Sequence, residues 1–198
     1  MKPFFSEKTI QDRFTMILGE IENDVKKLEL PDVVEIGRQR TLETLYRRYS
    51  LGLLDLDLKR MKMSEMKKLE VSRYEKNGRP VPVYKNHVLI SIPYTGPDSL
   101  FDYIPAAMEG PVPAGELADG YVVLPIPIDN ASEKVRREVD ALSRCTDLIN
   151  RDANSFNENL RQTLEGKLDE RQAEIEREHE EYRKVEVFVQ EHNKLRWS

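Results

Sequence analysis

Residues 131–168 read ASEKVRREVDALSRCTDLINRDANSFNENLRQTLEGKL, and this stretch decides the fold. Its apolar residues recur every three or four positions, which is the spacing of one face of an α-helix. They are Val135, Val139, Leu142, Ile149, Ala153, Phe156, Leu160, Leu164 and Leu168. Asn130 and Glu133 are typical of a helix N-terminus. The pattern predicts a long C-terminal helix with one buried face, and we expect Phe156 to lie in that face.

The helical pattern continues past Leu168, but charged residues dominate it. Residues 165–186 contain nine acidic and five basic residues, and only Ile175 and Tyr182 prolong the apolar stripe. Unbroken from residue 131 to 184, this helix would be roughly 80 Å long. It therefore projects or folds back, and the Asn-rich segment 150–157 or Gly166 is where we expect a break. Because heptads are not sustained, a helical hairpin or a docking surface is favoured over a long parallel coiled coil.

Apolar residues return at the C-terminal end of the sequence. Val185-Glu-Val-Phe-Val189 forms a short cluster, and Leu195 and Trp197 follow it. Exposing such a cluster to water is unfavourable, and aromatic residues are common anchors of protein interfaces. The sequence predicts a contact with a second subunit or a partner protein through Val187, Phe188, Leu195 and Trp197.

The first 130 residues change from helical to strand periodicity. Residues 6–28 and 32–49 are expected to be helices, the second with Asp32 as its N-cap. Strands are expected at 54–63 with a bulge near Lys59–Arg60, and at 69–75, 79–84, 87–92 and 121–128, with Asn77-Gly78 as a hairpin turn. These elements predict an α+β fold, in which a small antiparallel sheet of about five strands packs on the N-terminal helices. We expect a platform domain at 1–130 and a helical, coiled-coil-like extension at 131–198.

Prolines and glycines restrict the structure expected of two segments. Pro125 and Pro127 lack the N–H that a ladder needs, so the strand at 121–128 is expected at a sheet edge. Residues 94–120 are rich in turn formers and predict a long ordered loop with a short helical turn around Leu100–Ile104. Asp98 is expected to cap that turn.

No arrangement of residues predicts an active site. There is one cysteine, Cys145, which lies on the helical stripe and is expected to be a small buried residue. No phosphate-binding loop or nucleophile motif occurs. The pair Glu176 and His179 has a spacing that some metal-binding bundles use, but we interpret it as part of a solvated face. We expect no enzyme activity, cofactor or metal. The enzymatic alternative is acid–base chemistry in the loop that contains Tyr94, Asp98, Asp102 and Tyr103.

One basic region stands out in a chain whose net charge is −5. Residues 59–85 hold nine basic and three acidic residues, a charge of +6, so the rest carries −11. Lysines on an edge strand commonly prevent sheet aggregation, and we favour that interpretation. The alternative is a nucleic-acid-associated component that contacts phosphates through Lys67, Lys68, Arg73, Lys76 and Arg79.

Segments from His87 onward also resemble a known class of protein. HVLISIPYTGPDSLFDYIP, YVVLPIPI and LINRDANSFNENLRQTLEGKLDERQAEIE are similar to N-terminal modules of bacterial anti-phage defence proteins. The similarity rests on the IPYTG turn and on Asp152, Phe156, Asn157 and Leu160. It implies a recognition or assembly module, whose enzymatic effector belongs elsewhere.

Together these features predict a non-catalytic scaffold or interaction subunit. It would assemble with itself or with a protein partner through the long helix. No stretch reaches 18 apolar residues, and the N-terminus lacks the apolar core of a secretion signal. We therefore expect a cytoplasmic protein that does not enter a membrane.

Overall fold

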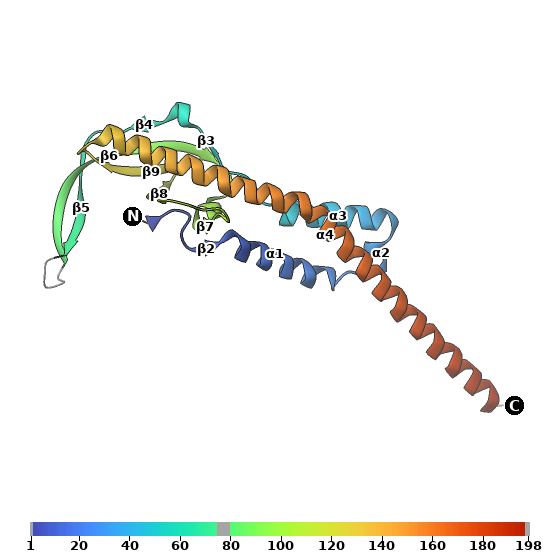
Figure 1. Cartoon of the computed structure of the whole chain (residues 1–198). Coiled ribbons are helices and arrows are strands. Elements are labelled where there is room, and N and C mark those ends of the chain that lie inside the picture. Colours follow the sequence, from blue (N-terminus) through green and yellow to red (C-terminus); the bar gives the residue numbers. More distant parts are fainter. Residues whose placement is uncertain (1, 75–79, 197–198) are drawn as a thin grey trace. The chain divides into compact units, whose positions relative to one another are not determined.

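The computed structural model describes residues 2–74 and 80–196 (Figure 1). For residues 2, 35–36, 71–74, 80–82 and 193–196 it describes the backbone. Residues 1–13 and 52–154 form one compact unit, and residues 14–51 and 155–198 form a second. Neither unit ends at residue 130, so the division at 130 stays a prediction about independently folding parts.

A curled antiparallel sheet is the framework of the first unit, and β6 (Pro80–Thr95) is its longest strand (Figure 1). Three strands pair in succession along one edge of β6: β5 (Lys67–Tyr74), β4 (Lys62–Met63) and β3 (Asp55–Leu56). On the other edge, β6 pairs with β9 (Tyr121–Pro127), which pairs in turn with β8 (Ala114–Ala118). The terminal strand β1 (Lys2–Pro3) pairs with β8. Separately, β2 (Lys8–Thr9) pairs in parallel with β7 (Tyr103–Ile104).

The predicted strands at 79–84 and 87–92 are one strand. Residues 80–87 of β6 pair with β5, and residues 87–93 pair with β9, so the two halves have different partners. The predicted bulge near Lys59 is also wrong. A 3₁₀ turn, η1 (Leu58–Arg60), separates β3 from β4, and the Asp57 carboxylate accepts the Arg60 N–H at 3.2 Å.

The strand β9 lies inside the sheet, so its predicted edge position is wrong for its first half. Its residues Tyr121 to Val123 pair with β8, whereas Pro125 and Pro127 lie beyond that pairing. The Ile128 N–H donates to Asn86 of β6. Backbone nitrogens along a strand point alternately to its two sides, so those of Pro125 and Pro127 point away from β6. They face the side of β9 on which β8 has already ended. The prolines therefore occupy the half of β9 with one neighbour.

The buried residues of the first unit alternate along its strands and recur along the helix α4 (Ala131–Arg196). The strands contribute Val88, Ile90, Ile92, Val122, Leu124 and Ile126, and α4 contributes Ala141, Leu142, Cys145, Ile149 and Ala153. The turn-rich segment adds Leu100 and Phe101 from the 3₁₀ helix η2 (Asp98–Asp102), which confirms the predicted helical turn.

In the described part of the second unit, the regular elements are all helices. It contains α1 (Ile10–Val25) from Phe14 onward, α2 (Leu30–Val33), α3 (Glu35–Tyr49) and α4 from Ser155. Its core consists of Ile17, Ile21, Val25, Val33, Leu42, Leu45, Tyr49, Leu160, Leu164, Leu168 and Ile175. The expected single helix at 32–49 is interrupted at Val34, and Asp32 instead forms a capping box with Glu29 at the start of α2. A side chain at Gly37 would collide with the Pro31 carbonyl, so glycine permits this close turn.

The helix α4 runs without interruption for 66 residues, so the helical-hairpin alternative is wrong. The asparagines expected to break it bind other backbone segments instead. In the first unit, Asn150 accepts the Leu54 N–H at 2.8 Å and donates to the Leu54 carbonyl at 2.7 Å. In the second unit, Asn157 bonds both backbone groups of Leu51 at 2.8 Å. The α+β class, with an antiparallel sheet, N-terminal helices and a long C-terminal helix, is confirmed.

Candidate interaction surfaces

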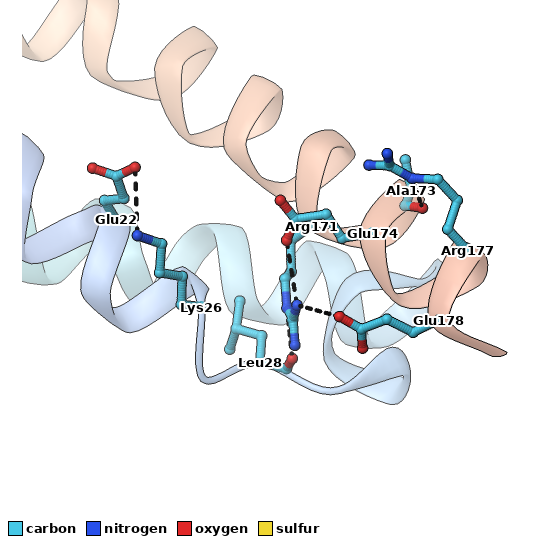
Figure 2. A network of polar contacts seen from close by, with 8 residues as sticks. All are labelled: Glu22, Lys26, Leu28, Arg171, Ala173, Glu174, Arg177 and Glu178. Carbon is cyan, nitrogen blue, oxygen red and sulfur yellow. Dashed lines mark hydrogen bonds and ion pairs between the residues drawn. The ribbon is translucent and has the colours of Figure 1, made fainter. Parts of the chain in front are cut away.

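The packed part of α4 in the second unit ends at a network around Arg171 (Figure 2). The Arg171 guanidinium donates to the Leu28 carbonyl at 3.2 Å and lies 3.3 Å from the Glu174 carboxylate and 3.9 Å from that of Glu178. Up to residue 192, where the described side chains of α4 end, Ile175 is the last buried residue, with 4% of its surface exposed. The network therefore fixes α4 where its contact with the second unit's core ends.

Beyond this point lies the α4 tail, which we define as residues 176–192. All of these residues are exposed. Five are large and apolar, with exposed fractions from 49% to 70%: Tyr182, Val185, Val187, Phe188 and Val189. Packing on an apolar face normally supplies most of a helix's stability. This tail presents such a face with nothing described against it.

The apolar residues of the tail do not all share one side. At 3.6 residues per turn, Tyr182, Val185 and Val189 prolong the stripe of Leu168 and Ile175. We call these three residues the tail stripe. Phe188 borders it, and its ring stacks on the His192 ring with centroids 6.1 Å apart. Val187 lies about 140° around the helix from Tyr182, on the opposite side.

The partner residues predicted from sequence stay a prediction, and the two whose side chains are described lie on different sides of the helix. Val187 and Phe188 are both exposed, as a contact surface requires, but only Phe188 adjoins the tail stripe. The sequence prediction did not select the stripe residues. The seven-residue spacing of Ile175, Tyr182 and Val189 was the signal that could have found them. Of the other two predicted residues, Leu195 lies in α4 with an undescribed side chain, and Trp197 lies outside the described residues.

The three basic residues of the tail interact with the helix itself. Lys184 lies 2.8 Å from the Glu181 carboxylate and 3.4 Å from that of Glu180, and its hydrogen bonds to both raise the Lys184 pKa. Arg177 donates to the Ala173 carbonyl and Arg183 to that of His179. Glu176 accepts a bond from Gln172 at 2.8 Å. In residues 2–74 and 80–196, no three His, Cys, Asp or Glu side chains gather as a metal-binding group, and this includes the surroundings of Glu176 and His179.

Two hollows in the second unit are candidate ligand sites. One lies over Val187 and is bordered only by side chains of α4, so a single helix cannot enclose a ligand there. The other is an open groove of about 560 Å³ along α1, α2 and α3. Its Asp24 carboxylate accepts from the Tyr49 hydroxyl and from Arg48, both at 2.7 Å, and from Lys27 at 3.1 Å. Burial and this bond to Asp24 raise the pKa of Tyr49 to about 12. The charges at that end of the groove thus satisfy one another.

The loop considered for acid–base chemistry forms one close pair. The Tyr94 hydroxyl donates to Asp98 at 2.6 Å, and burial followed by this bond raises the Tyr94 pKa to about 12. Pro97 is the N-cap of η2 and Asp98 is its first residue, so the predicted capping role of Asp98 is wrong. Asp102 and Tyr103 end η2 and begin β7. A phenol that stays protonated near neutral pH is a weak general base.

Cys145 is fully buried, as predicted. Its sulfur lies 3.7 Å from that of Met108, and burial raises the thiol pKa. Because the thiolate is the nucleophile, this environment makes Cys145 unreactive.

The described lysines of the predicted hairpin are divided between two faces. In the pairing of β5 with β6, Lys67 lies opposite His87 and Leu69 opposite Lys85, whereas Lys68 lies opposite Asn86 on the other face. Arg73 pairs with Val81 through a described backbone, and Lys76 and Arg79 lie outside the described residues. The described lysines therefore do not form one continuous phosphate-binding face.

Comparison of the chain with protein-family models, with curated proteins and with solved structures finds no match. Among the described residues, no helix combines the length and apolarity that crossing a membrane requires.

Proposed function

We propose that the protein is a non-catalytic interaction subunit, which binds another protein chain through the α4 tail. One observation supports this most strongly. Residues 176–192 are all exposed, although Tyr182, Val185, Phe188 and Val189 together present a large apolar surface. Contiguous exposed apolar surface is typical of sites where proteins associate.

The surroundings of the candidate chemical groups support the same proposal. Tyr94 stays protonated beside Asp98, and Cys145 is buried with a raised pKa, so neither is poised for catalysis. The groove in the second unit has its Asp24 carboxylate occupied by three donors of the same chain. From the sequence resemblance, a role in anti-phage defence stays a prediction about the setting of this assembly.

The test is affinity capture of the full chain from its native host, with cross-linking to locate the contact. The test variant carries Val185→Ser, Phe188→Ser and Val189→Ser, which removes apolar surface and keeps every charge. Met63→Ser is the control, because Met63 is 71% exposed and lies in β4 of the first unit. We expect the triple variant to lose a protein partner or an oligomer that the control keeps, with cross-links mapped to the tail. Equal recovery of every bound protein and an unchanged oligomeric state would refute the proposal.

A further inference from the structure

The tail stripe lies between acidic side chains. In heptad terms, Ile175, Tyr182 and Val189 occupy position a, and Glu178 and Val185 occupy position d. Glu181 then occupies a flanking position g, and Glu186 a flanking position e. Both flanks next to Tyr182 and Val185 therefore carry carboxylates.

The basic residues of the tail lie away from this surface. Lys184 and Arg177 are about 160° and 140° around the helix from Tyr182, and Arg183 is about 100° away. Lys184 is held by Glu180 and Glu181, and both arginines bond carbonyls of their own helix. The tail as a whole has six acidic and three basic residues. The surface around the stripe therefore carries more acidic than basic side chains, although Glu178 lies 3.9 Å from Arg171 and Glu181 lies 2.8 Å from Lys184.

This distribution of charge disfavours a second copy of the chain as the occupant. In a parallel, in-register pair, Glu178 would face Glu178 of the second copy inside the seam, and Glu181 would oppose Glu186. In an antiparallel pair that aligns Val185 of one copy with Val189 of the other, Glu186 would lie opposite Glu186 of the second copy. Like charges that face each other across such a seam destabilise it, most strongly where they are desolvated.

We propose that the tail stripe is the docking surface for an amphipathic helix of a different protein, whose apolar residues are flanked by lysine or arginine. This inference rests on the proposed function and names the chemistry of the partner. Basic residues on the partner helix would meet Glu181 and Glu186 on the two flanks and Glu178 in the seam. Apolar residues between them would cover Tyr182, Val185 and Val189, with Phe188 at the border.

The test uses the full chain and two designed helical peptides of about three heptads each. Both carry leucine at positions a and d; one carries lysine at e and g, and the other carries glutamate there. Binding is measured by fluorescence anisotropy of the labelled peptide, at low and at physiological salt. We expect the lysine peptide to bind at least about tenfold more tightly than the glutamate peptide, with a smaller ratio at high salt.

Matched valine substitutions separate docking on the stripe from general attraction of a basic peptide. Val185→Ser with Val189→Ser keeps all charges, and we expect this double variant to bind the lysine peptide about tenfold more weakly. Val187→Ser makes the same chemical change at a similar exposure on the opposite side, and binding should stay within about twofold. Glu181→Gln with Glu186→Gln should reduce the preference for lysine over glutamate.

Several results would overturn the inference. They are equal binding of the two peptides, no binding of either, or an equal loss in the Val187→Ser variant. Sedimentation of the chain alone tests the other occupant. If the chain alone forms a dimer, and Val185→Ser with Val189→Ser dissociates it, the occupant of the stripe is a second copy. That result would refute the basic partner while leaving the proposed function intact, whereas failure of the capture experiment would refute the function itself.

Discussion

Replacing Asn150 by alanine tests whether the long helix is fixed to the first unit by one side-chain amide. This amide accepts the Leu54 N–H at 2.8 Å and donates to the Leu54 carbonyl at 2.7 Å, and Leu54 is only 3% exposed. Each lost bond costs about 1 kcal/mol, and a buried backbone group left without a partner costs more. The higher helix propensity of alanine offsets about 0.5 kcal/mol of this loss of stability. The net loss is about 2 kcal/mol.

For a chain of this length, 1 kcal/mol shifts the melting temperature by about 2–4 °C, so Asn150→Ala should lower it by about 4–8 °C. Circular dichroism during heating measures the shift. The control is Asn159→Ala, because Asn159 is exposed and its side-chain amide donates to the Ser155 carbonyl of its own helix at 2.8 Å. We expect that variant to melt at or slightly above the parent temperature.

The variant Asn150→Asp sharpens the test. Aspartate keeps the acceptor for the Leu54 N–H but places a carboxylate oxygen against the Leu54 carbonyl, so it should be at least as destabilising as alanine at neutral pH. Repulsion by that carbonyl would raise the pKa of the new carboxyl in the folded state. The protonated carboxyl can donate to the Leu54 carbonyl, so the loss of stability relative to the parent should become smaller as the pH falls. If Asn150→Ala melts within about one degree of the parent, or aspartate is harmless, the two-bond reasoning fails.

Four further predictions concern other parts of the molecule. Gly166→Ala should stabilise the protein by roughly 1 kcal/mol in chemical denaturation, since an added methyl meets nothing within 4 Å and alanine favours helix; a loss of stability would contradict this. Phe156→Ala should cost roughly 2 kcal/mol, less than for a fully buried ring, because Phe156 is half-buried and stacks on Phe14 at 4.5 Å; an unchanged melting temperature would remove it from the core. The fold favours protonated Tyr49, whose pKa is about 12. Its contribution to the free energy of unfolding is therefore complete below pH 10 and disappears as the pH rises through 12, and Tyr49→Phe should flatten the fall in that free energy over this window. In gel-shift assays at physiological salt we expect no binding of DNA or RNA, and a salt-sensitive shift abolished by Lys67→Gln with Lys68→Gln would instead favour the nucleic-acid alternative.

Periodicity predicted the elements whose side chains face one core. The apolar residues of α4 recur at helical spacing, and those of β9 alternate, so the sequence alone indicated both elements. The strand β8 was not predicted, because Gly115 counted there as a turn residue. In the fold, a side chain at Gly115 would come within 2.4 Å of the Val123 carbonyl, so glycine permits close approach of β9.

Long-range hydrogen bonds explain the main error about the helix. Asparagine favours caps and turns when its side chain bonds nearby backbone, and this preference predicted a break at residues 150–157. Asn150 and Asn157 instead bond Leu54 and Leu51, which are about a hundred positions away in sequence. Their spacing of seven residues matches one helix face, but no local pattern identifies the segment they bind. The same limit applies to the tail stripe, because exposure of Val185 and Val189 depends on where the packed part of α4 ends.

The arrangement of the second unit also constrains when the chain can fold during synthesis. Its core joins residues 17–49 to residues 160–175, and every strand of the seven-stranded sheet except β1 is encoded between them. At about 5–20 residues per second, the ribosome needs roughly 6–25 seconds to proceed from residue 51 to residue 175. Throughout this interval Ile17, Ile21 and Leu42 lack the helix that finally covers them. A nascent chain therefore emerges with its first helices unpaired, and a chaperone that shields them would act on this protein before its last helix is made.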